Sequence, residues 1–479
     1  MPAQVLVSGP ELGIRLEGGK KSYSPGDIVS GCIHRSIPTI STSAEATISL
    51  HGQSESKVSQ SAGYTRKVFV NRCRFFSPRQ TTQSLYSDQP LDIQSDSSGA
   101  SWPFAITIPE YLDPQAIATS DIKQKRSFLE LSSDAVAAQA IPSSFQAGNK
   151  TIGGFVEYYL QAKFQFVTQR KAFFSRQYTT ECHEAIMPLR VEYFSPGPPM
   201  MDFPLKRYTT SKQISSQRLI PGMEDTKLSL SQKTQQFLGS SKVPRLMLKF
   251  HFDVPTVLQL DNENPVPLNV GLEPIWNSTS DIIREVPQNF TIEYLVVRIK
   301  PTTELPMKTE RFTVARKAID VIAEDTVASL DAKIQVPLVV AVDTNKNPET
   351  VDIGKIVNFT LSRAAIRKIA TQRHGTKLYP SFTTYNISHQ YQLSWELHGV
   401  MAGEKIKLDG THYVKLLPPS SSTQNQPAEL SEAPPAYVKS EKSKLDGTPN
   451  VTSLSPSSST QNPPTGLPEA PPAYKKGDN

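Results

Sequence analysis

Two copies of the sequence Pro-Pro-Ala-Tyr, at residues 434–437 and 471–474, are the groups of this chain best suited to a specific chemical task. Adjacent prolines hold φ near about −65° and favour a polyproline II helix, so little conformational entropy is lost on docking. Because this helix has about three residues per turn, the first proline and the tyrosine lie on one side. WW domains bind that shape in grooves lined by aromatic rings. The pattern predicts six WW-binding residues: Pro434, Pro435, Tyr437, Pro471, Pro472 and Tyr474.

The two motifs belong to a tandem repeat. Residues 407–439 align without gaps with residues 444–476, and 23 of the 33 positions are identical. The unit is mostly polar and has no face to stack on a neighbour, which favours a duplicated peptide ligand over a solenoid. Tyr437 and Pro471 lie 34 positions apart. A flexible chain of that length spans about 30 Å, so two adjacent WW modules of one partner could bind with avidity. The alternative is that both sequences are incidental parts of a proline-rich linker.

The sequence offers little for catalysis or metal binding. Residues 13–22 are rich in glycine, but Gly19 stands where a phosphate-binding loop needs lysine. Cys182-His183-Glu184 has no second ligand pair at metal-binding spacing, and we expect it in or beside a strand. The three cysteines are widely spaced, contain no CxxC pair and suggest no disulfide framework. We therefore expect a protein that is not an enzyme and that needs no cofactor, no metal and no nucleic-acid partner.

Basic side chains gather in two segments. The formal net charge of the chain is +6. Arginine suits phosphate or carboxylate recognition through its planar fork of donors. One hypothesis is that these side chains contact acidic or phosphorylated cargo, or an anionic membrane surface; the alternative is ordinary solvated edges that discourage strand aggregation. The candidate residues are Arg66, Arg72, Arg74, Arg363, Arg367, Lys368 and Arg373.

Short alternating runs, separated by Pro, Gly and Ser clusters, predict the elements that must carry these groups. β-Branched and aromatic runs of this kind are typical of antiparallel sandwiches. A helical turn is expected at 134–140, and residues 362–373 are expected to form a basic helix or an extended loop. In the run 385–400, alternate side chains from Ile387 to Leu397 are expected to share one face. The predicted strands are 13–16, 28–33, 46–52, 66–75, 104–108, 155–166, 246–254, 290–299, 334–342, 355–361 and 385–400.

The pattern divides the chain into four parts. We expect an all-β fold with one sandwich at 1–195, a linker with an ordered strand inside it at 196–243, and a second sandwich at 244–408. The Pro- and Ser-rich residues 409–479 cannot bury enough apolar surface to offset their ordering entropy, so we expect a disordered tail. No run approaches 18 apolar residues and the first residues do not resemble a secretory signal, which favours a cytoplasmic protein.

The first 408 residues resemble the arrestin superfamily, and most closely the fungal α-arrestin-like proteins. In the first domain the likeness rests on Tyr23-Ser24-Pro25-Gly26-Asp27-Ile28-Val29-Ser30-Gly31, which is similar to the family's turn into an early strand. In the second domain it rests on Tyr379-Pro380-Ser381-Phe382-Thr383 and the strand after it. The remaining similar pieces are Trp102-Pro103-Phe104, Ile141-Pro142-Ser143-Ser144-Phe145 and Val156-Glu157-Tyr158-Tyr159-Leu160.

This resemblance implies two tandem immunoglobulin-like antiparallel β-sandwiches, the arrestin N and C domains, and a role. Such proteins act as ubiquitin-ligase adaptors: they recognise the cytosolic tails of membrane transporters or receptors, and their PPxY motifs bring a HECT-type WW-domain ubiquitin ligase to that cargo. Ubiquitination then drives endocytosis and endosomal sorting, so recruitment to the plasma membrane and endosomes is expected. The alternative is a ligase-independent arrestin-fold trafficking scaffold of retromer type, which has no need of two PPxY copies.

Overall fold

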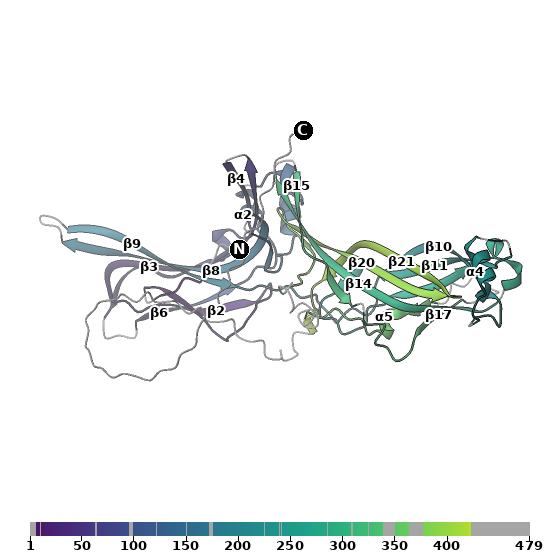
Figure 1. The fold of residues 1–479 in the computed structure, drawn as a ribbon. Coiled ribbons are helices and arrows are strands. Elements are labelled where there is room, and N and C mark those ends of the chain that lie inside the picture. The colour runs from purple at the N-terminus through teal and green to yellow at the C-terminus, as the bar shows by residue number, and fades with distance from the viewer. Residues whose placement is uncertain are drawn as a thin grey trace, which may run out of the picture. The chain divides into compact units, whose positions relative to one another are not determined.

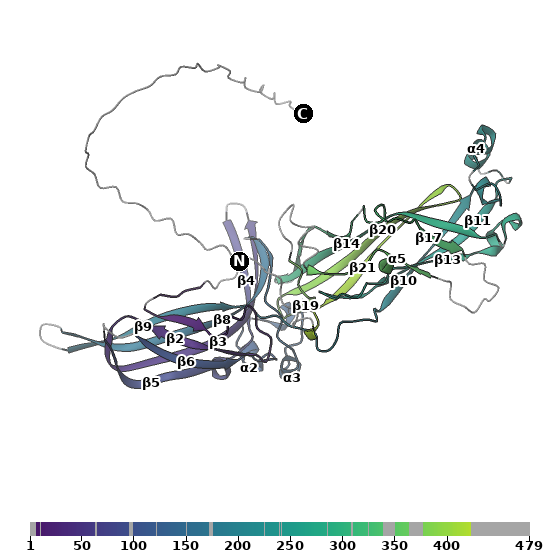
Figure 2. The ribbon, with the colours of Figure 1, turned by 90° about the horizontal axis from the view of Figure 1, so that it is seen from below.

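The computed structural model describes most of the chain up to Ser422. The described residues are 6–9, 11–62, 65–94, 99–120, 122–149, 151–171, 176–224, 226–238, 240, 242–284, 286–307, 310–323, 325–338, 350–363 and 377–422. Figure 1 traces them as two groups of sheets, and the same elements are seen from below in Figure 2. The chain divides into two units, residues 1–427 and 428–479, and everything described lies in the first.

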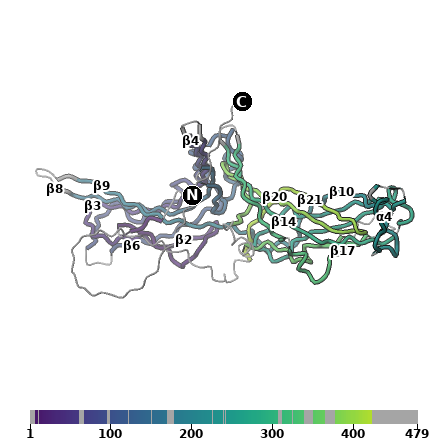
Figure 3. The backbone as a smooth tube through the Cα atoms, in the orientation of Figure 1, coloured from purple at the N-terminus to yellow at the C-terminus, as the bar shows by residue number. Residues whose placement is uncertain are grey.

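The first sandwich is built from a three-stranded and a six-stranded sheet, in which every pair of strands is antiparallel. The smaller sheet has the order β1 (Gly13–Leu16), β2 (Ile28–Arg35), β6 (Ala100–Thr107). The larger has the order β4 (Thr65–Arg74), β3 (Thr39–Ala62), β8 (Ile152–Lys171), β7 (Phe145–Gly148), with β5 (Thr82–Ile93) on β3 and β9 (Arg176–Leu189) on β8. The long β8–β9 hairpin can be followed in Figure 3.

Alternate side chains of these strands fill the core of the first sandwich. Val29 and Ile33 of β2 and Ile48 and Leu50 of β3 are almost completely buried. Trp102 of β6 stacks on Phe164 of β8 with ring centroids 5.4 Å apart, which joins the two sheets. Each buried aliphatic or aromatic side chain contributes about 1.5–3 kcal/mol of transfer free energy, so the alternating pattern itself drives this layering.

The second sandwich pairs a four-stranded with an eight-stranded sheet. The smaller sheet has the order β10 (Leu205–Ser215), β11 (Arg245–Pro255), β13 (Asn269–Pro274), β18 (Thr350–Asp352). The larger has the order β12 (Val257–Gln259), β21 (Glu404–Leu417), β20 (Ser388–Met401), β14 (Gln288–Met307), β15 (Glu310–Ala315). β16 (Ile319–Ile322) and β17 (Ile334–Leu338) pair with β14, and β19 (Phe382–Thr383) pairs with β20. Aromatic rings close its core, with Phe252 of β11 4.2 Å from Trp395 of β20, measured between ring centroids.

The helices within the described ranges are short. They are α1 (Pro78–Thr81), α2 (Pro114–Ala118), α3 (Ser133–Ala137), α4 (Leu230–Phe237) and α5 (Ile353–Ile356), with 3-10 turns at Gln124–Arg126, Gln217–Leu219, Trp276–Ser278 and Asp281–Ile283. The helical turn expected at 134–140 is α3. Among the described residues, no helix combines the length and the apolar character that crossing a membrane requires.

The structure confirms the all-β class and the two sandwiches, whose strand pairs are antiparallel except for β12 with β21. The strand expected inside the predicted linker 196–243 is β10, but it pairs with β11 along its whole length and buries Ile214 in the second core, so the second sandwich begins before residue 244. In β20 the alternation is as predicted, because the side chains at odd positions from His389 to Leu397 are all buried.

Two predicted boundaries, at 243/244 and at 408/409, and one predicted strand are wrong. Residues 409–417, assigned to the tail, continue β21 as far as Leu417, because alternate side chains such as Val414 and Leu416 are buried while Tyr413 and Lys415 are exposed. Residues 355–361, expected as a strand, instead begin within α5, which Asp352 caps by accepting a hydrogen bond from the backbone N–H of Lys355. A capping carboxylate at this position satisfies a donor that a helix start otherwise leaves unpaired.

Candidate functional site

The six predicted WW-binding residues lie outside the described residues. They are Pro434, Pro435, Tyr437, Pro471, Pro472 and Tyr474. What the structure describes is the point at which the chain leaves the second sandwich. Ser195 donates its backbone N–H to Pro419 O at 2.8 Å and accepts the N–H of Ser421 at 2.9 Å. Ser420 is 1% exposed, and its hydroxyl donates to the carbonyl of Gly197.

The first motif follows this anchored segment in the sequence. Pro434 comes 12 positions after Ser422, the last described residue. An extended chain of that length spans at most about 40 Å.

The basic strand β4 presents its charges as the sequence predicts, but one of them is already engaged. Arg72 and Arg74 are exposed on either side of buried Cys73. The Arg72 guanidinium lies 2.6 Å from Glu55 on β3, and this hydrogen bond is the main reason that the pKa of Arg72 is raised. Arg74 is exposed, whereas the side chain of Arg66 is outside the described part. The charge of Arg72 is therefore compensated within the sheet, whereas Arg74 is exposed.

Of the four candidate residues in the second basic segment, the structure describes Arg363. Arg367, Lys368 and Arg373 lie outside the described residues. Arg363 binds Asp261 through its guanidinium Nε, and its backbone N–H donates to the same carboxylate at 2.8 Å. Its Nη1 is 3.9 Å from Glu192. Two carboxylates thus compensate the charge of Arg363, which favours a structural role over cargo binding for this residue.

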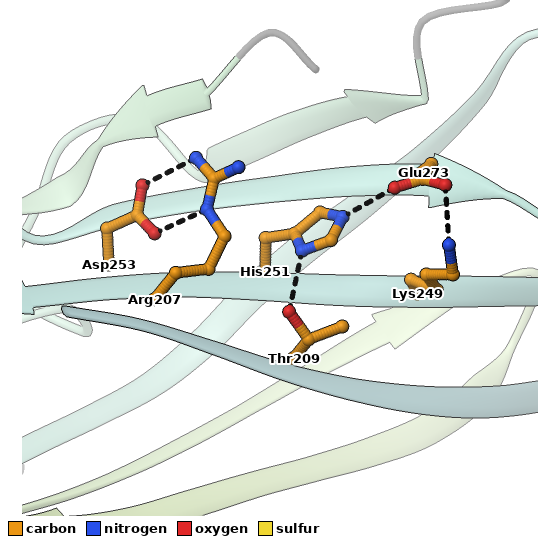
Figure 4. A network of polar contacts seen from close by, with 6 residues as sticks. All are labelled: Arg207, Thr209, Lys249, His251, Asp253 and Glu273. Atoms are coloured by element: carbon orange, nitrogen blue, oxygen red, sulfur yellow. Dashed lines mark hydrogen bonds and ion pairs between the residues drawn. The ribbon is translucent and has the colours of Figure 1, made fainter. Parts of the chain in front are cut away.

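A polar network covers the face shared by β10, β11 and β13 (Figure 4). Arg207 makes two parallel hydrogen bonds to Asp253, at 2.8 and 2.9 Å. His251 is 6% exposed and bridges Thr209 at 3.0 Å and Glu273 at 2.9 Å.

Charge neutralisation within this network is close to complete. Lys249 lies 2.8 Å from Glu273, and this hydrogen bond is the largest cause of the lowered pKa of the Glu273 carboxyl. Because every charge in Figure 4 faces an opposite charge or a hydrogen-bond partner, the network fixes the register of three strands rather than presenting a free reactive group.

The cysteine–histidine segment considered for metal binding lies in sheet structure. Cys182-His183-Glu184 lies on β9, as expected, where His183 stacks on Phe166 and contacts Glu11 at 3.0 Å. No group of three or more His, Cys, Asp or Glu side chains within the described ranges has the geometry of a metal site.

One site was missed by the sequence reasoning. A cavity of about 590 Å³ at the end of the second sandwich is lined by β10, the turn after it, α4 and the β20–β21 turn. Its charged side chains are Lys212, Arg218, Lys233, Glu404, Lys405 and Lys407. The only local signal is the exposed lysine alternation of Lys405 and Lys407, because the other cations come from a segment interpreted as a linker. We call this cavity the tip pocket.

No protein-family model matches the chain, and a search among curated proteins finds no match either. Any assignment of function therefore depends on the residues of the chain itself.

Proposed function

We propose that this protein is an arrestin-like ubiquitin-ligase adaptor. Its two sandwiches recognise membrane cargo, the cytosolic tails of transporters or receptors, and its tail recruits a HECT-type WW-domain ubiquitin ligase to that cargo. The observation that carries the proposal is the pair of Pro-Pro-Ala-Tyr motifs following two antiparallel sandwiches. Recruitment to the plasma membrane and endosomes follows from the cargo.

Three features support these separate roles for the sandwiches and the tail. Residues 418–479 contain no aromatic side chains other than Tyr437 and Tyr474. Both tyrosines lie in the motifs, and a tyrosine in a segment this rich in proline and serine gains most of its apolar burial from a binding partner. The chain is held at Ser420, so a ligase bound to the first motif stays within reach of anything held by the sandwiches.

The test measures binding of the full-length protein to a purified tandem WW-domain fragment. We expect wild-type protein to bind, Tyr437→Ala and Tyr474→Ala each to weaken binding by about tenfold or more, and the double variant to lose it, since two linked weak sites combine by avidity. Tyr413→Ala is the matched control, because Tyr413 is 66% exposed on β21 and lies outside both motifs.

A wild-type protein that does not bind the WW fragment removes the link to a ligase. In that case the ligase-independent scaffold of retromer type becomes the better account, since it needs the sandwiches and not the tail. Binding that survives in the double variant would show that the WW domains contact some other part of the chain.

A further inference from the structure

A further cavity, of about 320 Å³, lies where residues of the two sandwiches meet. One wall comes from the first sandwich, through residues between 139 and 145 and between 193 and 196. The other comes from the second sandwich, through residues 379–383 and the end of β21 between 415 and 418. All of these residues belong to the same compact unit of the chain. We call this cavity the junction pocket.

Hydrogen bonds to two serines hold both walls in place. The hydroxyl of Ser143 accepts the backbone N–H of Tyr193 at 2.8 Å, which ties together the two segments of the first sandwich. On the other side, Ser381 donates its backbone N–H to Leu416 O at 2.7 Å, and its hydroxyl accepts the N–H of Leu416 at 2.9 Å. Because the walls are fixed in this way, the cavity exists before a ligand binds, which lowers the conformational cost of binding.

Aromatic side chains form much of the lining. Phe145 is 3% exposed, and its ring centroid lies 4.9 Å from that of Tyr379 and 4.8 Å from that of Phe382. Tyr193 adds a fourth ring to the lining and is 37% exposed. Pockets for small molecules are lined mainly by such apolar and aromatic groups, against which a ligand buries its own apolar surface. The junction pocket therefore suits a ligand with an apolar body.

The polar groups beside these rings supply hydrogen-bond donors. The hydroxyls of Ser143 and Ser381 each accept a backbone N–H, and within the described ranges neither donates to another group, so both protons are available. Lys415 also lines the pocket; it is exposed and makes no ion pair in the part of the chain that the structure describes. Among the described residues of the lining, none carries a carboxylate. The lining thus favours a negatively charged acceptor.

We propose that the junction pocket binds a small apolar carboxylate, an acid whose aromatic or aliphatic body lies against the rings and whose carboxylate accepts from Lys415 and the serine hydroxyls. An ionised carboxylate is acceptor-only, so it matches a lining that supplies donors. Its charge-assisted hydrogen bond to an ammonium group is about twice as strong as a neutral one. A volume of about 320 Å³ is at the lower end of the range for ligand sites, which favours a compact acid. This site goes beyond the proposed adaptor function and does not depend on it.

A cationic ligand is the alternative, because aromatic rings also attract quaternary ammonium groups through their π faces. In the junction pocket this attraction is opposed by the charge of Lys415. Since the described lining contains no carboxylate, nothing there compensates that repulsion. The sign of the charge on the ligand therefore discriminates between the two possibilities, and the experiment is built on it.

The experiment titrates full-length protein by calorimetry with three ligands of nearly equal shape: naphthoate, the neutral naphthamide and the cation naphthylmethylammonium. We expect naphthoate to bind saturably with a Kd of about 1 mM or tighter. Naphthamide should bind about tenfold more weakly, because it lacks the charge, and the cation more weakly still. A separate titration with octanoate distinguishes an aliphatic from an aromatic body as the preferred ligand.

A substitution at Lys415 locates the binding. Lys415→Gln should weaken the binding of naphthoate by about tenfold and leave that of naphthamide unchanged, since only the charged contact is lost. The matched control is Lys405→Gln, an exposed lysine of the same strand that does not line the junction pocket, and it should bind naphthoate as the wild type does. Both variants should fold, because both side chains are exposed, and an unchanged thermal unfolding transition verifies this.

Three results would overturn the proposal. The first is that neither naphthoate nor octanoate binds saturably to wild-type protein at concentrations up to about 10 mM. The second is that the cation binds as tightly as naphthoate, which would show that the rings alone select the ligand. The third is that Lys415→Gln and Lys405→Gln bind naphthoate equally well, which would place the binding outside the junction pocket.

Discussion

At the scale of single residues, Asn386 shows how one polar side chain can hold distant segments together. It is fully buried, and its amide donates to Ser54 O at 3.1 Å and to Asn71 O at 2.9 Å. Its carbonyl oxygen accepts the hydroxyl of Thr384 at 3.1 Å and that of Ser54 as well. This one side chain thus forms hydrogen bonds with β3, β4 and the turn before β20. These bonds provide the partners that buried polar groups require.

The first prediction concerns Asn386→Ala. The substitution leaves two backbone carbonyls and the Ser54 hydroxyl without their buried partner, so we expect a loss of about 2–4 kcal/mol in the free energy of unfolding. Urea denaturation measures it. Asn289→Ala, at an exposed position of β14, should change stability by no more than about 0.5 kcal/mol. Equal effects of the two substitutions would show that the Asn386 contacts add nothing net.

A second residue, His389, makes stability depend on pH. Burial is the main reason that its pKa is lowered to about 3, and the charge of Arg316 lowers it further. Tyr391 donates its hydroxyl proton to Tyr379 O at 2.7 Å, so it must accept from His389 Nε2 at 3.0 Å. Nδ1 then accepts the hydroxyl of Thr303 at 2.9 Å. The native structure therefore holds a neutral imidazole.

The second prediction follows from this lowered pKa. Between the unfolded pKa of about 6.5 and the folded value of about 3, the unfolded chain binds a proton that the folded chain does not. Stability is therefore full above pH 6.5 and falls as the pH is lowered, by up to about 1.4 kcal/mol per pH unit. In His389→Gln this slope between pH 6 and 4 should be smaller, as measured by urea denaturation. His51, whose pKa is also lowered by burial, to about 4, remains in both proteins. Identical slopes would contradict the assignment.

At the scale of elements, the strands were predictable where alternation is clear and local. β20 is the best case, because its apolar side chains recur at every second position and bury one face. α5 was not predicted as a helix, because the run after its N-cap, Asp352, is mostly apolar and was interpreted as a strand. The C-terminal part of β21, from residue 409 onward, was assigned to the tail, and residues 407–411 are identical to the tail residues 444–448. The same five residues are a strand in the first copy because β20 pairs with them there.

The third prediction uses this duplication as its own control. Leu408 is 3% exposed and pairs with Leu397 of β20, so Leu408→Ala should lower the free energy of unfolding by about 2–4 kcal/mol. Leu445 occupies the equivalent position of the second repeat copy, with the same neighbours in sequence. Since the tail is expected to contribute no core, Leu445→Ala should leave stability unchanged. A comparable loss from Leu445→Ala would show that the second copy is folded.

The candidate sites also differ in how far they could be predicted from the sequence. The Pro-Pro-Ala-Tyr motifs can be recognised from sequence because a short peptide ligand carries its recognition groups within four residues. The engagement of Arg363 by Asp261, 102 positions away, could not be foreseen from either segment alone. The tip pocket was equally hidden, since it joins residues 212–236 with residues 402–407. Whether a basic side chain forms an ion pair within the fold or is available to a ligand depends on contacts between residues far apart in the sequence.

At the scale of the whole molecule, the proposed function depends on the separation of the two motifs. Tyr437 and Pro471 are 34 positions apart, which corresponds to an r.m.s. span of about 30 Å for a flexible chain. A second binding event in one complex is then intramolecular, and its effective concentration depends on whether the spacer can reach. The sequence of the spacer matters less than its length.

The fourth prediction tests that dependence by deleting residues 441–467, which leaves the two motifs 7 positions apart, since 34 minus 27 is 7. A spacer of that length spans at most about 25 Å when fully extended and about 15 Å on average. Affinity of the full-length protein for a tandem WW fragment should therefore fall toward that of a single motif, whereas affinity for one isolated WW module should not change. Replacing the same 27 residues by a Gly/Ser sequence of equal length should retain the tandem affinity. If the deletion leaves tandem binding intact, the two motifs act one at a time, and the repeat raises only the local concentration of ligand.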